Sequence, residues 1–172
     1  MSGHAFVVHA ARLRRSTGTR WDVERAGPVA DLAVGDTVVP EGADASATVT
    51  LESVAGGVSV VGVVDAPWAG ECRRCLRPTS GQVHVAVREL YTPGGDGEDT
   101  YPLRDDEIDL EPLVRDAVLL ELPVTSLCRP DCRGLCPACG ADWNEGPCGC
   151  EAPADPRWAA LDVLRGEPGA ED

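Results

Sequence analysis

Hydrophobic and polar positions alternate most regularly in the middle of the chain. Three runs rich in β-branched residues carry this pattern, at 47–54, 58–64 and 82–91. Such runs are typical of β-strands. Turn-forming residues separate or border them, at Gly56-Gly57, Pro67–Gly70 and Pro78–Gly81. Gly56-Gly57 suits a tight hairpin because both positions tolerate a positive φ. We therefore expect an antiparallel meander.

The segments on either side of this meander have weaker patterns. Residues 1–30 begin with apolar positions and continue into an arginine-rich stretch, which predicts a strand followed by a polar excursion. Residues 92–107, TPGGDGEDTYPLRDDE, have no periodicity and are rich in glycine, proline and acidic residues. This composition predicts an exposed loop.

An amphipathic helix is predicted after the loop, over residues 109–122. Asp109 is a plausible N-cap, Pro112 falls in the first turn, and Pro123 ends the helix. The apolar residues recur at helical spacing, at Leu110, Leu113, Val114, Ala117 and Val118.

A short docking helix is predicted near the C-terminus. Asp155 is its N-cap, Pro156 its first residue and Gly166 its stop. One face of this helix would carry Trp158, Leu161 and Leu164.

Length and charge limit the classes of protein that fit. A chain of 172 residues suits one principal core, and no stretch approaches the roughly 20 apolar residues of a membrane span. With no signal pattern at the N-terminus, we expect a soluble, cytoplasmic protein. The net charge is −14, and residues 91–127 hold ten acids but two arginines, whereas residues 1–90 hold ten acids and nine arginines. Any RNA contact must therefore use a local arginine patch.

The common catalytic motifs are missing from the sequence. The chain has no lysine, which excludes a P-loop, and neither HExxH nor GxSxG occurs. His4, His9 and His84 are scattered and fit surface positions better than a catalytic base. The acids at 105–109 precede the predicted helix, where they complement its N-terminus and stay hydrated. We predict no catalytic residue and no enzyme.

Eight cysteines carry the clearest chemical signal. Closely spaced cysteines in a reducing cytoplasm favour a metal site over a disulfide framework. Tetrahedral zinc takes four thiolates at about 2.3 Å, and a CxxC turn presents two sulfurs to one ion. We expect one site from the motifs ECRRCL and LCRPDCR and a second from CPACG and CGC. The predicted ligands are Cys72, Cys75, Cys128 and Cys132 for site 1, and Cys136, Cys139, Cys148 and Cys150 for site 2.

The cysteine spacing allows other interpretations. Cys128, Cys132, Cys136 and Cys139 could share one ion, which would leave the remaining four for the other. A CxxC pair can also be a redox dithiol, but such pairs usually act alone. Iron suits four thiolates too, yet the chain has few aromatic residues to screen it, so zinc fits better. Four protein ligands leave no position for water, so two structural zinc ions are expected.

These patterns predict an α+β protein with three parts. Residues 1–127 would form an antiparallel β-rich body that includes the first CxxC and the packed helix. Residues 128–150 would form a zinc-knuckle module, and residues 151–172 the docking helix and tail.

Arginines gather around the cysteines of site 1. Guanidinium groups bind phosphate through a fork of donors and stack on exposed bases, so these residues are candidates for RNA contacts. They could equally balance the negative charge of a thiolate-rich zinc centre. The candidates are Arg73, Arg74, Arg77, Arg129 and Arg133. Four further arginines, at positions 12, 14, 15 and 20, are weaker candidates.

Three ordered motifs resemble one protein family. The motif ECRRCL after a β meander, then DLEPLVRDAVLLELPV leading into CRGLCPACGADWNEGPCGC, and finally DPRWAALDVLR look like the YceD family, also called large ribosomal RNA subunit accumulation protein. The resemblance covers most of the chain from about Leu51 onward.

The resemblance implies a bacterial cytoplasmic factor, without enzymatic activity, for the accumulation of 23S ribosomal RNA. It would act by binding precursor RNA or a large-subunit assembly intermediate. Family members without the second group of cysteines keep the first CxxC, which implies that site 2 is a separable module. A zinc-stabilised adaptor that contacts proteins of the same pathway, and a thiol redox protein, are the alternatives.

Overall fold

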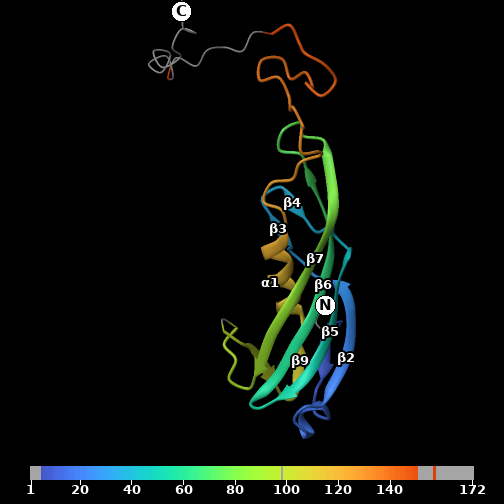
Figure 1. Cartoon of the computed structure of the whole chain (residues 1–172), viewed down its shortest axis with the longest axis vertical. Coiled ribbons are helices and arrows are strands. Elements are labelled where there is room, and N and C mark those ends of the chain that lie inside the picture. The colour runs from blue at the N-terminus through green and yellow to red at the C-terminus, as the bar shows by residue number, and fades with distance from the viewer. Residues whose placement is uncertain (1–4, 98, 151–156, 158–172) are drawn as a thin grey trace, which may run out of the picture.

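The computed structural model describes residues 5–97, 99–150 and 157 (Figure 1). Within these residues the chain forms a mostly antiparallel sheet, one short 3-10 helix and one α-helix. In chain order the elements are β1 (Val7–His9), η1 (Leu13–Arg15), β2 (Arg20–Pro28), β3 (Ala33–Val34), β4 (Thr37–Val38), β5 (Asp44–Val54), β6 (Gly57–Glu71), β7 (Pro78–Thr92), β8 (Tyr101–Arg104), β9 (Glu107–Asp109) and α1 (Glu111–Glu121). This architecture confirms the β-rich α+β prediction in its coarse form.

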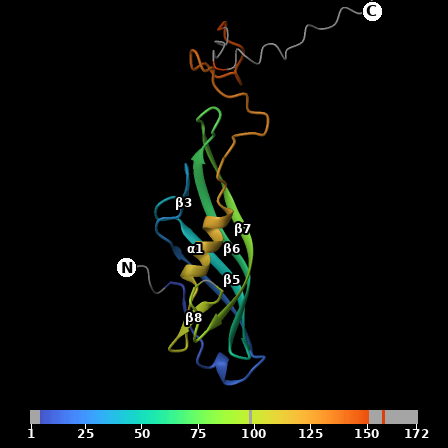
Figure 2. The same ribbon diagram turned by 90° about the vertical axis from the view of Figure 1, so that its left-hand side faces the viewer.

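The long strand β6 organises the sheet. It pairs from Val58 to its end at Glu71 with β7 and along its first nine residues with β5, both antiparallel. Strand β2 extends the sheet beyond β5 over nine paired residues. On the other side β8 pairs with β7 in parallel, and β9 and β1 follow. Figure 2 shows the resulting elongated shape, in which β6 and β7 reach beyond the rest of the body.

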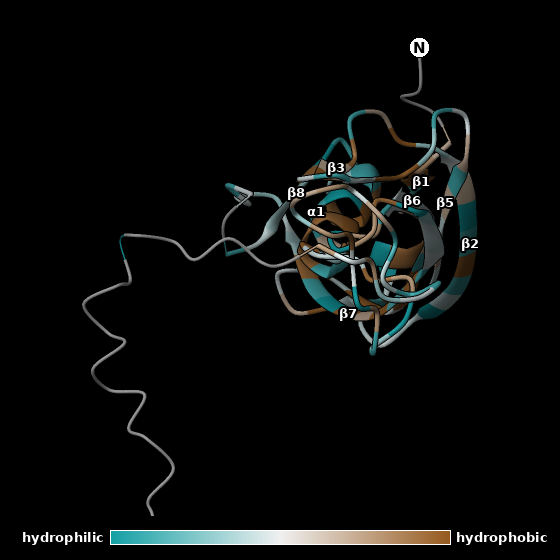
Figure 3. Ribbon diagram, turned by 90° about the horizontal axis from the view of Figure 1, so that it is seen from above, coloured by the Kyte–Doolittle hydropathy of each residue, from teal (hydrophilic) through white to brown (hydrophobic). Residues whose placement is uncertain are grey.

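The main hydrophobic core lies between the sheet and α1. Leu113, Val114 and Val118 of the helix are buried and belong to the same core cluster as the inward side chains of β5, β6 and β7. The strands curve around α1 (Figure 3). The two edges of the curved sheet approach each other, because a Cβ at Gly27 of β2 would lie 2.8 Å from Ala5, just before β1. The helix, eleven residues long, is too short and too polar to cross a membrane.

The first hairpin turns one residue earlier than predicted. Val54 pairs with Gly57, so the two turn residues are Ala55 and Gly56, and Gly56 has a φ of +88°. Gly57 instead lies in β6, where a Cβ would fall 2.1 Å from the carbonyl oxygen of Tyr91. Both glycines are needed, but the second serves the close approach of β7 and not the turn.

The predicted turns at Pro67–Gly70 and Pro78–Gly81 are wrong. Both segments are strand residues that pair with each other, with Trp68 opposite Gly81. Proline is tolerated at Pro67 because the β5 pairing ends at Asp65 and β4 pairs only at Ala69. Glycine is required at Gly81 because the Trp68 ring packs over it, 2.7 Å from where a Cβ would lie. The chain reverses only at the CxxC motif.

Two further stretches contain strands that the pattern did not predict. Residues 20–28, predicted as part of a polar excursion, form β2, whose charged side chains point to solvent on an edge of the sheet. The predicted exposed loop at 92–107 contains β8 and the start of β9. Asp105 and Asp106 form the turn of the β8–β9 hairpin with φ values of +48° and +60°, a conformation that aspartate tolerates better than most residues.

The N-cap of the helix lies one residue later than predicted. Leu110 and not Asp109 is its N-cap residue, and α1 runs from Glu111 to Glu121. Asp109 still serves the helix start, because its carboxylate accepts a hydrogen bond of 3.0 Å from the Glu111 N–H. Asp106 does not face the helix and is paired with Arg14. The predicted helix near the C-terminus lies outside the described residues.

Candidate metal centres at the tip of the β6–β7 hairpin

The turn between β6 and β7 is the first CxxC motif. Glu71 pairs with Pro78, so residues 72–77 form the turn. Two backbone hydrogen bonds of 2.8 Å close it, from the Leu76 N–H to the Cys72 carbonyl and from the Cys72 N–H to the Arg77 carbonyl. The turn places the Cys72 and Cys75 sulfurs on one side. Leu76 has a φ of +59°, which is unusual for a residue with a Cβ.

Ser126 holds the returning chain against this turn. Its hydroxyl donates a hydrogen bond of 2.7 Å to the Glu71 carbonyl and accepts one of 3.0 Å from the Thr79 hydroxyl. Its carbonyl accepts a hydrogen bond of 3.1 Å from the Arg73 N–H. Ser126 is buried, and no sequence pattern pointed to it. Its contacts bring the following residues, including Cys128, to the end of the hairpin.

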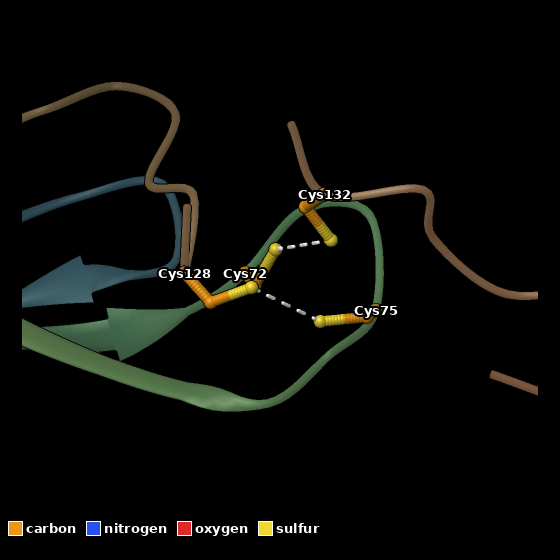
Figure 4. A group of neighbouring side chains, drawn as sticks. All are labelled: Cys72, Cys75, Cys128 and Cys132. Carbon is orange, nitrogen blue, oxygen red and sulfur yellow. Dashed lines mark hydrogen bonds between the residues drawn. The ribbon is translucent and has the colours of Figure 1, made fainter. Parts of the chain in front are cut away.

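The structure brings the four sulfurs predicted for site 1 together (Figure 4). The sulfurs of Cys72 and Cys132 are 3.8 Å apart, and those of Cys75 and Cys128 are 3.6 Å apart. These distances are far longer than the roughly 2.05 Å of a disulfide. They match the edge of about 3.8 Å that four sulfurs make around an ion at about 2.3 Å. The quartet therefore has the size of a tetrahedral metal site.

The second quartet is built on the same backbone as the first. The Gly140 N–H donates to the Cys136 carbonyl and the Cys136 N–H to the Ala141 carbonyl, both at 2.8 Å. Gly140 has a φ of +74°, and it occupies the place that Leu76 has in the first turn. The sulfurs of Cys136, Cys139, Cys148 and Cys150 lie within 4.8 Å of one another. The alternative in which 128, 132, 136 and 139 share one ion is not the arrangement observed.

The two quartets differ in exposure. Cys72, Cys75 and Cys132 are buried and form a small cluster of their own, against which Leu135 packs. In the second quartet only Cys136 is buried, and Cys139 and Cys150 are exposed. Site 1 is therefore the more buried centre and site 2 the more exposed one.

The thiols of site 1 ionise unequally. The Cys128 N–H contributes most to lowering the pKa of Cys72 to about 6. Burial raises the pKa of Cys132, but hydrogen bonds, chiefly from Asn144, outweigh it and the net pKa is lowered. Loss of hydration is the main cause that raises the pKa of Cys128 to about 12, and the neighbouring thiols raise it further, because a further thiolate would face those already formed. A divalent cation at the centre of the quartet removes this repulsion and holds all four as thiolates.

The second quartet shows the same division between its thiols. The indole N–H of Trp143 is the main cause that lowers the pKa of Cys148 to about 6, and it lies 3.3 Å from the sulfur. Interaction with Cys139 raises the pKa of Cys150 to about 12. Thiolates beside thiols at this spacing are suited to hold zinc or another thiophilic ion.

Two residues between the ligand pairs of site 2 donate to sulfurs, one in each site, and neither was predicted from the sequence. Trp143 donates to Cys148, and the Asn144 side-chain amide lies 3.4 Å from the Cys132 sulfur of site 1. Donors to ligand atoms orient them and tune the metal. For Asn144 the sequence does hold one signal: it is the only asparagine in the chain and lies between two ligand cysteines.

Three of the five candidate arginines are engaged within the tip. Arg74 donates to the Cys132 carbonyl at 2.7 Å, and Arg129 donates to the Asn144 side-chain oxygen at 2.7 Å. Arg77 pairs with Asp142 at 2.7 Å and with Glu145 at 2.6 Å, and the Asp142 charge is the main cause that raises its pKa.

The other two candidates, Arg73 and Arg133, are exposed at the same end of the molecule. Among the described residues, neither side chain has a hydrogen bond or an ion pair. The structure thus divides the predicted patch into three structural arginines and two that face solvent.

Comparison with known proteins gives the chain a family. The family described as "Large ribosomal RNA subunit accumulation protein YceD" matches residues 60–165. An uncharacterized protein of Mycobacterium tuberculosis is 39% identical over 177 residues, covering 94% of this chain and 86% of that protein. A maize chloroplast protein named large ribosomal RNA subunit accumulation protein YCED homolog 1 is 43% identical over 44 residues, covering 26% of this chain and 15% of that protein. No solved structure matches the chain. Since the family match covers more than half of the sequence, the chain belongs to the YceD family.

Proposed function

We propose that this protein is a non-enzymatic factor for the accumulation of 23S ribosomal RNA and the biogenesis of the large ribosomal subunit, acting in the cytoplasm. The family name implies the role in large-subunit rRNA accumulation. The observation that carries the proposal is the pair of four-cysteine groups at the end of a long hairpin. With four thiolate ligands each, two zinc ions would staple the tip and leave no open position for chemistry.

The binding surface in this proposal is the tip itself. Arg73 and Arg133 extend into solvent beside the first centre and would contact the phosphates of precursor rRNA or of a pre-ribosomal particle. Arg74, Arg77 and Arg129 would hold the tip in shape, since each already has a partner in the protein. A metal-stapled platform keeps the backbone of the two free arginines at a fixed spacing, which reduces the entropy lost on binding.

The test replaces the two free arginines and uses a matched control. Arg73→Gln with Arg133→Gln should weaken binding of the full-length protein to precursor 23S rRNA fragments. The slope of log affinity against log salt should become shallower by about 1.4, because each lost phosphate contact on a single strand contributes about 0.7. Arg12→Gln with Arg15→Gln removes the same charge at the opposite end of the molecule, on and beside η1 (Figure 1). An equal loss in both double variants would overturn the role of the tip.

A second candidate function is a protein-interaction adaptor in the same pathway. Leu76 is 60% exposed although its backbone is held in the left-handed region, and Leu127 is 37% exposed. Leu76 directly follows Cys75, and Leu127 directly precedes Cys128. Since the sulfurs of these two cysteines are 3.6 Å apart, the two leucines flank site 1. A strained, exposed leucine is a poor choice for stability alone and favours a contact with a protein partner.

The variant Leu76→Gly separates the two functions. Glycine accepts the left-handed conformation, so the turn should remain folded and stability should change by less than about 1 kcal/mol. An adaptor would lose its association with ribosomal proteins in this variant, and co-purification of those proteins with the unmodified protein would survive ribonuclease treatment. An RNA-binding factor would show the reverse pattern, with binding retained in Leu76→Gly and lost after ribonuclease.

A further inference from the structure

The side-chain amide of Asn144 makes four hydrogen bonds. Its nitrogen donates to the Asp142 carboxylate at 2.6 Å and to the Cys132 sulfur at 3.4 Å. Its oxygen accepts from the Arg133 N–H at 2.8 Å and from the Arg129 guanidinium at 2.7 Å. Two donors and two acceptor lone pairs are the full capacity of a primary amide. Three of the four partners lie in the 129–133 loop of site 1, so the amide is fitted into that loop.

The segment that carries Asn144 belongs to site 2. It lies between Cys139 and Cys148, which come from the two ligand pairs of the second quartet. Asp142 fixes Asn144 within this segment, because its carboxylate also accepts the Asn144 backbone N–H at 2.8 Å. Closure of the second quartet around an ion therefore holds both ends of the segment and, with them, the position of the amide.

Other contacts join the two centres, but they do not reach a ligand side chain. The Leu135 N–H donates to the Arg74 carbonyl at 3.1 Å, and the Trp143 N–H donates to the Gly134 carbonyl at 3.0 Å. Arg77 crosses from the first turn to Asp142 and Glu145. Among the described residues, Asn144 alone donates a side-chain hydrogen bond from the site 2 segment to a sulfur of site 1.

We propose that Asn144 is a positioning residue that couples the two metal sites: an ion in site 2 holds its amide on the Cys132 sulfur and so slows loss of the ion in site 1. The donated hydrogen bond spreads thiolate charge and fixes the sulfur on its ion. Loss of an outer partner of this kind typically weakens metal binding about 10-fold to 100-fold. Because coupling between two binding sites is reciprocal, an ion in site 1 strengthens binding at site 2 by the same factor. The inference needs both quartets to hold metal and is independent of the role in rRNA accumulation.

The experiment uses the full-length protein, purified under reducing conditions with its metal content counted by native mass spectrometry. Site 2 is emptied by Cys139→Ser with Cys150→Ser, since both side chains are exposed and leave the core unchanged. The rate of zinc transfer from site 1 to the chelator 4-(2-pyridylazo)resorcinol should then rise about 10-fold. Asn144→Ala alone should give a similar rise while both ions are still bound at the start. Pro147→Ala, an exposed change in the same segment, is the control and should leave the rate unchanged.

Combining the changes tests the coupling directly. If Asn144 transmits the effect, Asn144→Ala should add little to the rate of zinc loss once site 2 is empty, because both changes remove the same interaction, the hydrogen bond from Asn144 to the Cys132 sulfur. With cobalt in site 1, Asn144→Ala should also shift the sulfur-to-cobalt charge-transfer band, and Pro147→Ala should not. Rates that multiply in the combined variant, or an unchanged rate after site 2 is emptied, would overturn the coupling. Fewer than two ions in the unmodified protein would overturn the metal assignment as well.

Discussion

Metal removal should unfold the tip of the hairpin and leave the body folded. The 24 buried residues of the main core do not include any cysteine, whereas the tip cluster consists of Cys72, Cys75 and Cys132 with Leu135 against it. Burial of one partly exposed leucine contributes at most about 2 kcal/mol. Ordering the 23 residues 128–150 costs at least about 20 kcal/mol at roughly 1 kcal/mol each. Two structural zinc ions supply about 10–16 kcal/mol each, which is enough, so the tip depends on them.

Hydrogen exchange measured by mass spectrometry checks this expectation on the full-length protein. After chelation under reducing conditions, the Leu135, Cys136 and Trp143 amides should lose their protection, because their hydrogen bonds lie within the tip. The paired amides of residues 58–65 and 84–91 should keep theirs, since they lie in the core of the sheet. A tip that stays protected after elemental analysis shows that no metal is left would refute the reasoning. Simultaneous loss of protection in the body would refute it too.

Three further changes probe single contacts. Gly81→Val should displace the Trp68 ring and lower the free energy of unfolding by about 1–3 kcal/mol in urea titrations, whereas Gly94→Ala, which meets open space, should be neutral. Trp143→Phe removes the indole donor to Cys148 and should speed zinc loss from site 2 about 10-fold in the chelator assay. An unchanged rate would show that this hydrogen bond does not retain the metal. Tyr91→Phe leaves the Asp109 carbonyl without its 2.9 Å hydrogen bond and should cost about 1–2 kcal/mol. Tyr101→Phe, whose partner Asp116 is exposed to water, should cost less, and equal costs would contradict the role of burial.

The sequence predicted the centre of the sheet better than its ends. The runs at 47–54, 58–64 and 82–91 lie inside β5, β6 and β7, because their β-branched residues face the core at every second position. The strands continue through Pro67–Gly70 and Pro78–Gly81, which have the composition of turns. A turn signal is local, but here the chain reverses at the CxxC turn of residues 72–77. The segments before and after this turn pair because it brings them side by side.

Strands β2, β8 and β9 were missed for a related reason. In β2 the exposed positions Arg20, Asp22 and Glu24 are charged, and only Trp21 and Val23 between them pack against the core, so the apolar pattern is too short to predict a strand that pairs with β5 over nine residues. In the 101–109 hairpin two consecutive aspartates adopt a positive φ and form a tight turn. From composition alone, this acidic segment looks like a loop. The cysteine spacing predicted the two groups that the structure brings together, but the supporting contacts of Ser126 and Asn144 depend on residues far apart in the chain.

The charge of the tip limits how it can bind RNA. Each zinc with four thiolates has a formal charge of about −2. The four nearby carboxylates, at Glu71, Asp131, Asp142 and Glu145, add to this, so the five arginines do not make the tip positive overall. Tight, non-specific attraction to the RNA backbone is therefore not expected. Binding through Arg73 and Arg133 should instead show a shallow salt dependence, with a slope no steeper than about −2. A steep slope that survives substitution of both residues would locate the RNA contact elsewhere, and the absence of any binding would favour the adaptor, with Leu76 and Leu127 as its contact residues.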